Sequence, residues 1–157
     1  MGALIAGAFF VYRYINDRQV FARMDQGGVG DFPVSKRQYA AYLKFIEERD
    51  KADNFGSTTP EGTLELFVDA LKKEDVSLAT KYFVPEKQKK MEEDLILIIK
   101  NGRKEIVAGL VLDYEKKECL DYMDKCIFSS YLEEKKAWSE TQVIKNKFTN
   151  KWKIESL

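Results

Sequence analysis

The sequence predicts an α+β protein in which N-terminal helices pack on a curved antiparallel sheet, preceded by an apolar N-terminal helix. Apolar residues recur at helical spacing from residue 35 to about residue 116, whereas strand-like runs and short polar turns follow Glu118. Helices followed by strands with short connections are typical of an α+β fold with an antiparallel meander. We expect an anchor-like helix at 1–24, a linker and stalk helix at 25–57, and an α+β domain at 58–157.

Composition excludes several classes of protein and site. The 157 residues carry 26 Lys+Arg against 26 Asp+Glu, so the chain has no net positive charge to favour nucleic acid, and we expect no nucleic-acid partner. The absence of His removes Ser-His-Asp and Cys-His catalysis and every His-containing zinc site. We therefore predict no metal, no cofactor and no hydrolytic activity.

The N-terminal segment is the strongest sign of a membrane attachment. Residues 3–12 are uncharged, but this run is shorter than the roughly 20 residues that span a bilayer. Three interpretations stay open: the end of a truncated anchor, a short tilted anchor in which Arg13 reaches the interface, or an apolar helix docked on the soluble domain. We favour attachment through residues 1–24 and an extracytoplasmic domain, although Arg13, Arg18 and Arg23 favour a cytoplasmic C-terminal side.

The two cysteines, Cys119 and Cys126, do not make a disulfide framework or a CxxC motif. If they lie on adjacent strands, they are able to pair in an oxidising compartment. Because unpaired cysteine is among the most buried residue types, we expect two small buried side chains.

Capping residues predict where the helices begin. Ser35 begins a helix through Ala52, Thr59 precedes Pro60 at the start of another, and Asp75 begins a short one. Pro85 opens a further helix that Gly102 ends. Residues 103–116 fit both a helix and a strand, and their charged flanks favour the helix.

The C-terminal third predicts strands. We expect a possible short strand at 119–123, then strands at 126–132, 138–148 and 152–157. Lysines of the last strands, Lys153 among them, are expected on the polar outer face of the sheet, where Lys protects an edge from association. A basic aromatic surface for single-stranded nucleic acid or anionic lipid is the less favoured alternative. Trp138, Phe148 and Trp152 are expected in the core.

Two segments resemble the nuclear transport factor 2-like superfamily. Residues 59–71, with Lys73-Glu74-Asp75 and residues 79–83, are similar to the first helix, turn and second helix of these cone-shaped domains, and residues 150–157 look like their last strand. The resemblance covers about residues 58–157 and implies a cone with an internal cavity, as in bacterial members behind a membrane anchor. Enzymatic members place Asp, Tyr or His inside the cone, but no position here matches theirs, so no catalytic role is carried over.

We expect a membrane-attached, non-enzymatic domain that binds a small apolar ligand in the cone or a protein partner, or a second copy, at the sheet. The first alternative is an isomerase or dehydratase that uses Asp and Tyr, and the second is an envelope-assembly or interaction protein without a pocket. The weak catalytic candidates are Asp113 and Asp121, since a buried carboxylate beside a Tyr is able to act as a base. The candidate ligand-binding residues are aromatic: Tyr82, Phe83, Tyr114, Tyr122 and Trp138.

Overall fold

The computed structural model describes residues 17–25, 35–132 and 136–157. It divides the chain into two compact units, Met1–Arg49 and Asp50–Leu157, which are described separately. Among the described residues, no helix has the length and apolar character needed to cross a membrane. The apolar part of the predicted helix at 1–24 lies outside the described residues, which begin at residue 17.

The first unit contains a helix at residues 17–25 and most of α2 (Lys36–Ala52). Ser35 caps α2 as predicted, because its hydroxyl accepts a hydrogen bond from the Gln38 amide at 3.2 Å. The two helices are joined by the Tyr42 hydroxyl, which donates to Asp25 Oδ1 at 2.7 Å, and by the ring of Phe21, which lies 5.6 Å from that of Tyr42.

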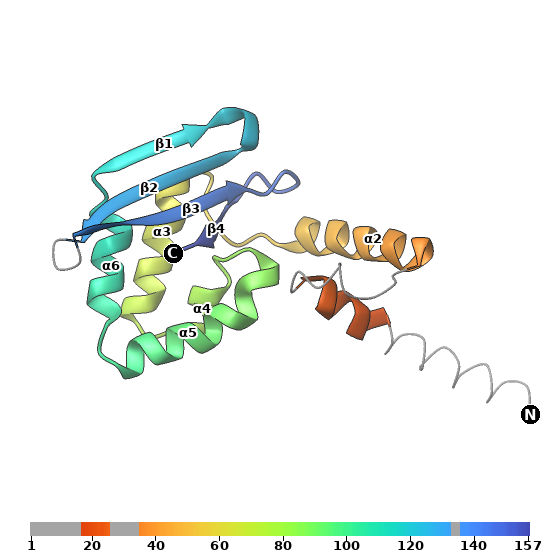
Figure 1. Cartoon of the computed structure of the whole chain (residues 1–157), viewed down its shortest axis with the longest axis horizontal. Coiled ribbons are helices and arrows are strands. Elements are labelled where there is room, and N and C mark those ends of the chain that lie inside the picture. Colours follow the sequence, from red (N-terminus) through yellow and green to blue (C-terminus); the bar gives the residue numbers. More distant parts are fainter. Residues whose placement is uncertain (1–16, 26–34, 133–135) are drawn as a thin grey trace, which may run out of the picture. The chain divides into compact units, whose positions relative to one another are not determined.

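The second unit is α+β, as the order of patterns predicted (Figure 1). Its helices come first: α3 (Pro60–Lys72), α4 (Val76–Thr80), the 3-10 turn η2 (Pro85–Lys87), α5 (Gln88–Lys100) and α6 (Lys104–Leu112). The strands follow: β1 (Lys116–Leu120), β2 (Lys125–Leu132), β3 (Ala137–Lys145) and β4 (Trp152–Ser156), with the 3-10 turn η3 (Asp121–Met123) between the first two.

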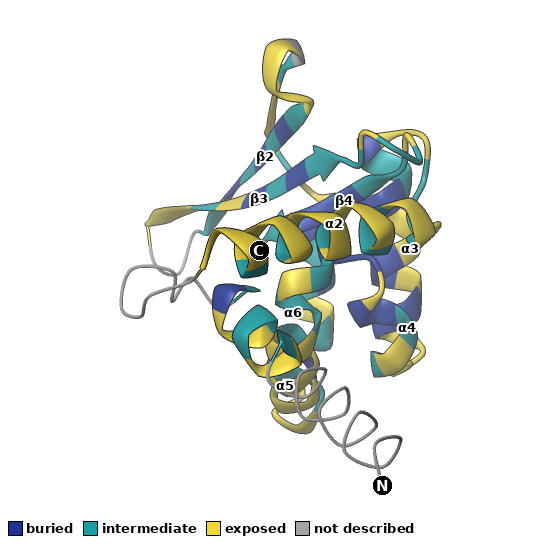
Figure 2. Cartoon of the chain, turned by 90° about the vertical axis from the view of Figure 1, so that its right-hand side faces the viewer, coloured by how far each residue is buried: buried dark blue, intermediate teal, exposed yellow. Residues whose placement is uncertain are grey.

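The sheet is an antiparallel meander in the order β1-β2-β3-β4. Helices α3 and α6 lie against one of its faces (Figure 1). Strand alternation aims every second side chain at these helices, so Phe128 and Val143 are fully buried with Phe67 and Leu64 of α3 (Figure 2). Phe67 and Phe83 meet edge to face at 5.2 Å. Trp152 is half-buried against this core, less deeply than predicted.

The predicted helix boundaries are confirmed by their capping bonds. Thr59 Oγ1 accepts from the Gly62 amide at 3.2 Å, and Asp75 Oδ1 accepts from the Leu78 amide at 2.9 Å. Gly102 follows α5 with φ of +66°, a conformation that costs glycine little, and residues 104–112 are helical as favoured.

Two predictions in the strand region are wrong, and a third holds for the side of the strand but not for exposure. Cys119 and Cys126 form a disulfide because they are directly paired across β1 and β2, and Cys119 is exposed rather than buried. Trp138 is 56% exposed and packs on Tyr131 outside the core. Lys153 does lie on the outer side of β4, but it is only 2% exposed because a carboxylate covers it.

Candidate functional site

The residues singled out in the sequence are dispersed. Asp113 follows α6 with its side chain exposed, and the side chain of Asp121 lies outside the described part of the structure. Tyr82 and Phe83 belong to the core, and half-buried Tyr114 meets the ring of Phe128 at 4.7 Å.

The two remaining aromatic candidates face solvent. Tyr122 is 81% exposed in η3, and Trp138 lies near the start of β3. None of these aromatic candidates lines either of the two pockets described below. Burial and the charge of Asp69 raise the pKa of the Tyr82 hydroxyl, which keeps it protonated.

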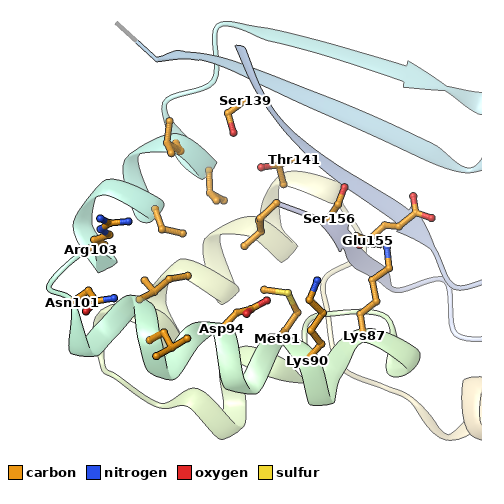
Figure 3. A pocket seen from close by; sticks show the side chains of 16 residues that line it. Lys87, Lys90, Met91, Asp94, Asn101, Arg103, Ser139, Thr141, Glu155 and Ser156 are labelled. Carbon is orange, nitrogen blue, oxygen red and sulfur yellow. Dashed lines mark hydrogen bonds between the residues drawn. The ribbon is translucent and has the colours of Figure 1, made fainter. Parts of the chain in front are cut away.

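The larger pocket lies between α5, α6 and the ends of β3 and β4, and encloses about 660 Å³ (Figure 3). This volume is within the range of roughly 300–1,000 Å³ found for small-molecule sites. Helical spacing forms its apolar floor: Met91 and Ile98 flank the fully buried Leu95 on one face of α5. Helix α6 contributes a second apolar face: Val107, Leu110 and Val111.

The sheet side of this pocket is a wall of hydroxyls from Ser139 and Thr141 on β3 and Ser156 on β4. Ser139 and Thr141 are two residues apart, so they share the inward face of the strand. Thr141 is only 4% exposed, and its hydroxyl forms no hydrogen bond among the described residues, although Oγ1 is not one of the fully buried side-chain oxygens.

The neighbouring buried hydroxyl of Ser130, by contrast, has a hydrogen-bond partner within the protein. Ser130 of β2 pairs with Ser139 in the register, and its Oγ donates to the Leu110 carbonyl at 2.6 Å. Buried hydroxyls in proteins nearly always have such a partner. The unpartnered Thr141 hydroxyl is therefore available to a molecule in the pocket.

Charged side chains surround the mouth of the pocket. Figure 3 shows Lys87 and Lys90 beside Glu155 and Ser156, with Arg103 at the other end. Lys87 is fixed in place because its Nζ donates to the Glu155 carbonyl at 2.6 Å.

The other charges at the mouth are unpaired. Within the part of the chain that the structure describes, the side chains of Lys90, Asp94 and Arg103 have no hydrogen bond or ion pair. The carboxylate of Glu155 is not available to them, because it pairs with Lys125 at 2.8 Å. The mouth therefore has three cationic side chains and one free carboxylate.

A second, smaller pocket of about 280 Å³ borders the disulfide, with Lys117, Lys125 and Lys145 around it. Two of these lysines already have acidic partners, since Lys117 pairs with Glu61 and Lys125 with Glu155. Among the residues with described positions, no group of three or more metal-ligating side chains is placed to hold an ion. This pocket has less free charge and a smaller apolar surface than the first.

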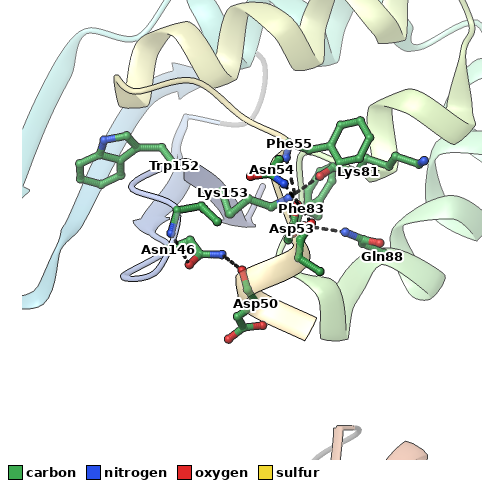
Figure 4. Close-up of polar contacts among 12 residues, drawn as sticks. Asp50, Asp53, Asn54, Phe55, Lys81, Phe83, Gln88, Asn146, Trp152 and Lys153 are labelled. Carbon is green, nitrogen blue, oxygen red and sulfur yellow. Dashed lines mark hydrogen bonds and ion pairs between the residues drawn. The ribbon is translucent and has the colours of Figure 1, made fainter. Parts of the chain in front are cut away.

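A third polar site is sealed rather than open (Figure 4). Lys153 Nζ lies 2.7 Å from Asp53 Oδ2 and donates to the Lys81 carbonyl at 2.5 Å. Burial lowers the pKa of the Lys153 ammonium, while the carboxylates of Asp53 and Asp50 oppose that change. The alternation of β4 predicts that Lys153 is exposed to solvent. The side chain of Asp53, which is distant in sequence, covers the Lys153 ammonium in place of water, and no local pattern indicates this contact.

Of the described residues that line the larger pocket, none is a Tyr, and the carboxylate of Asp94 is half-exposed at the mouth rather than enclosed with a proton donor. The sequence does not predict the pocket, because its walls come from four separate elements. The only available signals were the apolar faces of α5 and α6 and the hydroxyls in β3.

Comparisons with known proteins give no relative to draw on: no family model, no curated protein and no solved structure matches the chain.

Proposed function

We propose that Asp50–Leu157 is a binding domain whose larger pocket receives a small ligand with an apolar body. The observation that carries the proposal is the half-open cavity of about 660 Å³. Its apolar surface consists of the α5 floor, with Met91 and Ile98, and the α6 face, with Val107 and Leu110. Burial of apolar ligand surface contributes about 25 cal/mol of binding free energy per Å², so this apolar surface is sufficient to bind a ligand without any chemical step.

The enzyme alternative has less support. It requires an enclosed carboxylate beside a Tyr, whereas Asp113 is exposed and Tyr122 projects into solvent. The alternative of an interaction protein without a pocket is disfavoured by the cavity itself.

We further propose a nuclear transport factor 2-like fold behind a membrane anchor, on the extracytoplasmic side. Support for the fold is the order of elements, with helices α3 to α6 before a four-stranded antiparallel sheet and a pocket between them. Support for the location is the Cys119–Cys126 disulfide, because disulfides persist mainly in oxidising compartments.

The test uses Nile red, a neutral apolar dye, with the full chain purified without detergent. Val107→Trp fills the pocket from α6, and Ile106→Trp adds the same side chain at the preceding position, which is exposed and does not line the pocket. We expect wild type and Ile106→Trp to bind the dye with equal affinity, and Val107→Trp to lose most of that binding. Equal binding by all three proteins, or no binding by wild type, would contradict the proposal.

A further inference from the structure

We infer that the natural ligand of this pocket is an amphipathic monoanion, with an apolar chain or ring on the floor and one acidic group between Lys90, Lys87 and the Thr141 hydroxyl. This inference rests on the proposed function and adds the ligand's charge and its orientation. Three independent features of the described residues support it.

The first feature is the charge at the mouth. Lys87 and Lys90 lie at one end and Arg103 at the other, while Asp94 is the single unpaired side-chain carboxylate among the described lining residues, so the charged side chains of the mouth are in net positive excess (Figure 3). The other acidic residue at this end, Glu155, is held by Lys125. An anion that enters the pocket therefore meets cations that no protein carboxylate has already neutralised.

The second feature is the hydrogen-bonding character of the Lys87 end. A Lys ammonium only donates, and a Thr hydroxyl without a protein partner is free to donate as well. Lys90 on α5 and Thr141 on β3 line opposite walls, while the bond to the Glu155 carbonyl leaves Lys87 with two further N–H groups. Donors on opposite walls suit a group that only accepts, which is what an ionised carboxylate is.

The third feature is that the pocket combines apolar side chains with a cluster of polar groups at the Lys87 end. Lys87, Lys90 and Ser156 lie together at one end of the pocket, and Arg103 and Asn101 lie at the other (Figure 3). Apolar side chains of α5 and α6, among them Val107 and Leu110, line the same pocket. A molecule with one acidic group and an apolar body satisfies both regions at once. A purely apolar ligand leaves the Thr141 hydroxyl unpaired, and a multiply charged ligand places charge on the apolar floor.

The experiment compares three ligands that share one alkyl chain: octanoate, octanol and octylammonium. Each displaces Nile red from the full chain, and the concentration for half-displacement is measured. We expect octanoate to act at a concentration about fivefold lower than octanol, since hydrogen bonds to a charged group are stronger than neutral ones. Octylammonium is expected to be the weakest of the three.

Matched variants locate the acidic group. Lys90→Met keeps the length of the side chain and removes its charge, while Lys89→Met makes the same change at an exposed neighbour that does not line the pocket. We expect Lys90→Met to abolish the preference for octanoate over octanol and Lys89→Met to retain it. Thr141→Val is expected to weaken octanoate without weakening octanol.

The outcomes separate this inference from the proposed function. If wild type binds Nile red but octanol or octylammonium equals or exceeds octanoate, the site binds apolar molecules and the inference about charge is wrong. If the octanoate preference is lost in Arg103→Met and retained in Lys90→Met, the proposed orientation is wrong. If wild type does not bind Nile red at all, the proposed function fails, and the inference fails with it.

Discussion

Polar groups at the outer edge of β4 are hydrogen-bonded within the described part of the protein, whereas the Thr141 hydroxyl on the pocket wall of β3 is not. At the edge, the Trp152 amide donates to the Ser57 carbonyl at 2.9 Å, and the Trp152 carbonyl accepts from Thr63 Oγ1 at 3.1 Å. Two residues along, the Ile154 amide donates to Tyr82 O at 2.8 Å. On the wall, the hydroxyl of Thr141 has no hydrogen-bond partner among the described residues, although only 4% of the residue is exposed.

Backbone geometry adds to the closure of this edge. Gly56 has φ of +108°, and a Cβ at this position would lie 2.2 Å from the Trp152 carbonyl oxygen, so only glycine fits. The comparison indicates that the β4 edge is built for stability, while the β3 wall leaves polar groups available for a ligand. The predictions below test the two halves of this contrast.

The largest effect is expected at the buried ion pair of the sealed edge. Lys153→Met leaves the buried Asp53 carboxylate without its cation, and breaking such a pair costs about 3–5 kcal/mol. The matched control is Lys116→Met, which removes an exposed pair with Glu118 and costs at most about 1 kcal/mol. Urea denaturation measures both free energies of unfolding, and equal losses would contradict the sealed description.

The opposite edge of the sheet depends on a covalent bond. The disulfide between Cys119 and Cys126, seven positions apart, closes a short loop and is expected to contribute about 2–3 kcal/mol. Reduction is therefore expected to lower the urea midpoint of the wild type. The double variant Cys119→Ala/Cys126→Ala serves as the control, because its midpoint should not respond to reductant. An unchanged wild-type midpoint would show that β1 is held by its hydrogen bonds alone.

Two buried threonines give the sharpest comparison. Thr63→Val breaks the bond to the Trp152 carbonyl and leaves the Ser57 amide without its acceptor, so a loss of about 1–3 kcal/mol is expected. Thr141→Val breaks no protein hydrogen bond among the described residues, and its free energy of unfolding should stay within about 0.5 kcal/mol of wild type or rise. A loss at Thr141 as large as that at Thr63 would mean that the β3 wall is structural.

The smallest effect concerns pH, because Asp53 opposes part of the change that burial causes at Lys153. The pKa of Lys153 is lowered in the folded state, whereas in the unfolded chain it is about 10.4. Between these two values the unfolded state holds more protons, so the free energy of unfolding rises with pH. The contribution of Lys153 is the free energy of unfolding of wild type minus that of Lys153→Met, both measured in urea at each pH. A difference that falls as the pH approaches about 10 would contradict the prediction.

Local features of the fold were predictable from the sequence because each depends on neighbouring residues. Thr59 and Asp75 cap their helices through amides only three positions away, and Gly102 ends α5 by its own conformation. Strands β2 and β4 begin within one residue of the predicted position, since alternation and turn residues mark them.

The candidate site was not predictable, because its residues are brought together only by tertiary packing. Alternation placed Lys153 on the outer side of β4, and nothing local indicates that Asp53 covers it. Tyr122 and Trp138 were candidate ligand-binding residues because they are aromatic. The pairing of β2 with β3 places Trp138 directly opposite Tyr131, and the two rings pack together on the side of the sheet away from the helices. The pocket depends on how α5 and α6 lie against β3, which no single segment encodes.

The most direct test of the contrast is a methyl NMR titration of the full chain with octanol. The account predicts progressive shifts of the Ile98, Val107 and Leu110 methyl signals, which line the open pocket, while those of Val68 and Ile154 in the sealed core stay in place. Shifts of equal size in both groups, or none in the pocket, would contradict it.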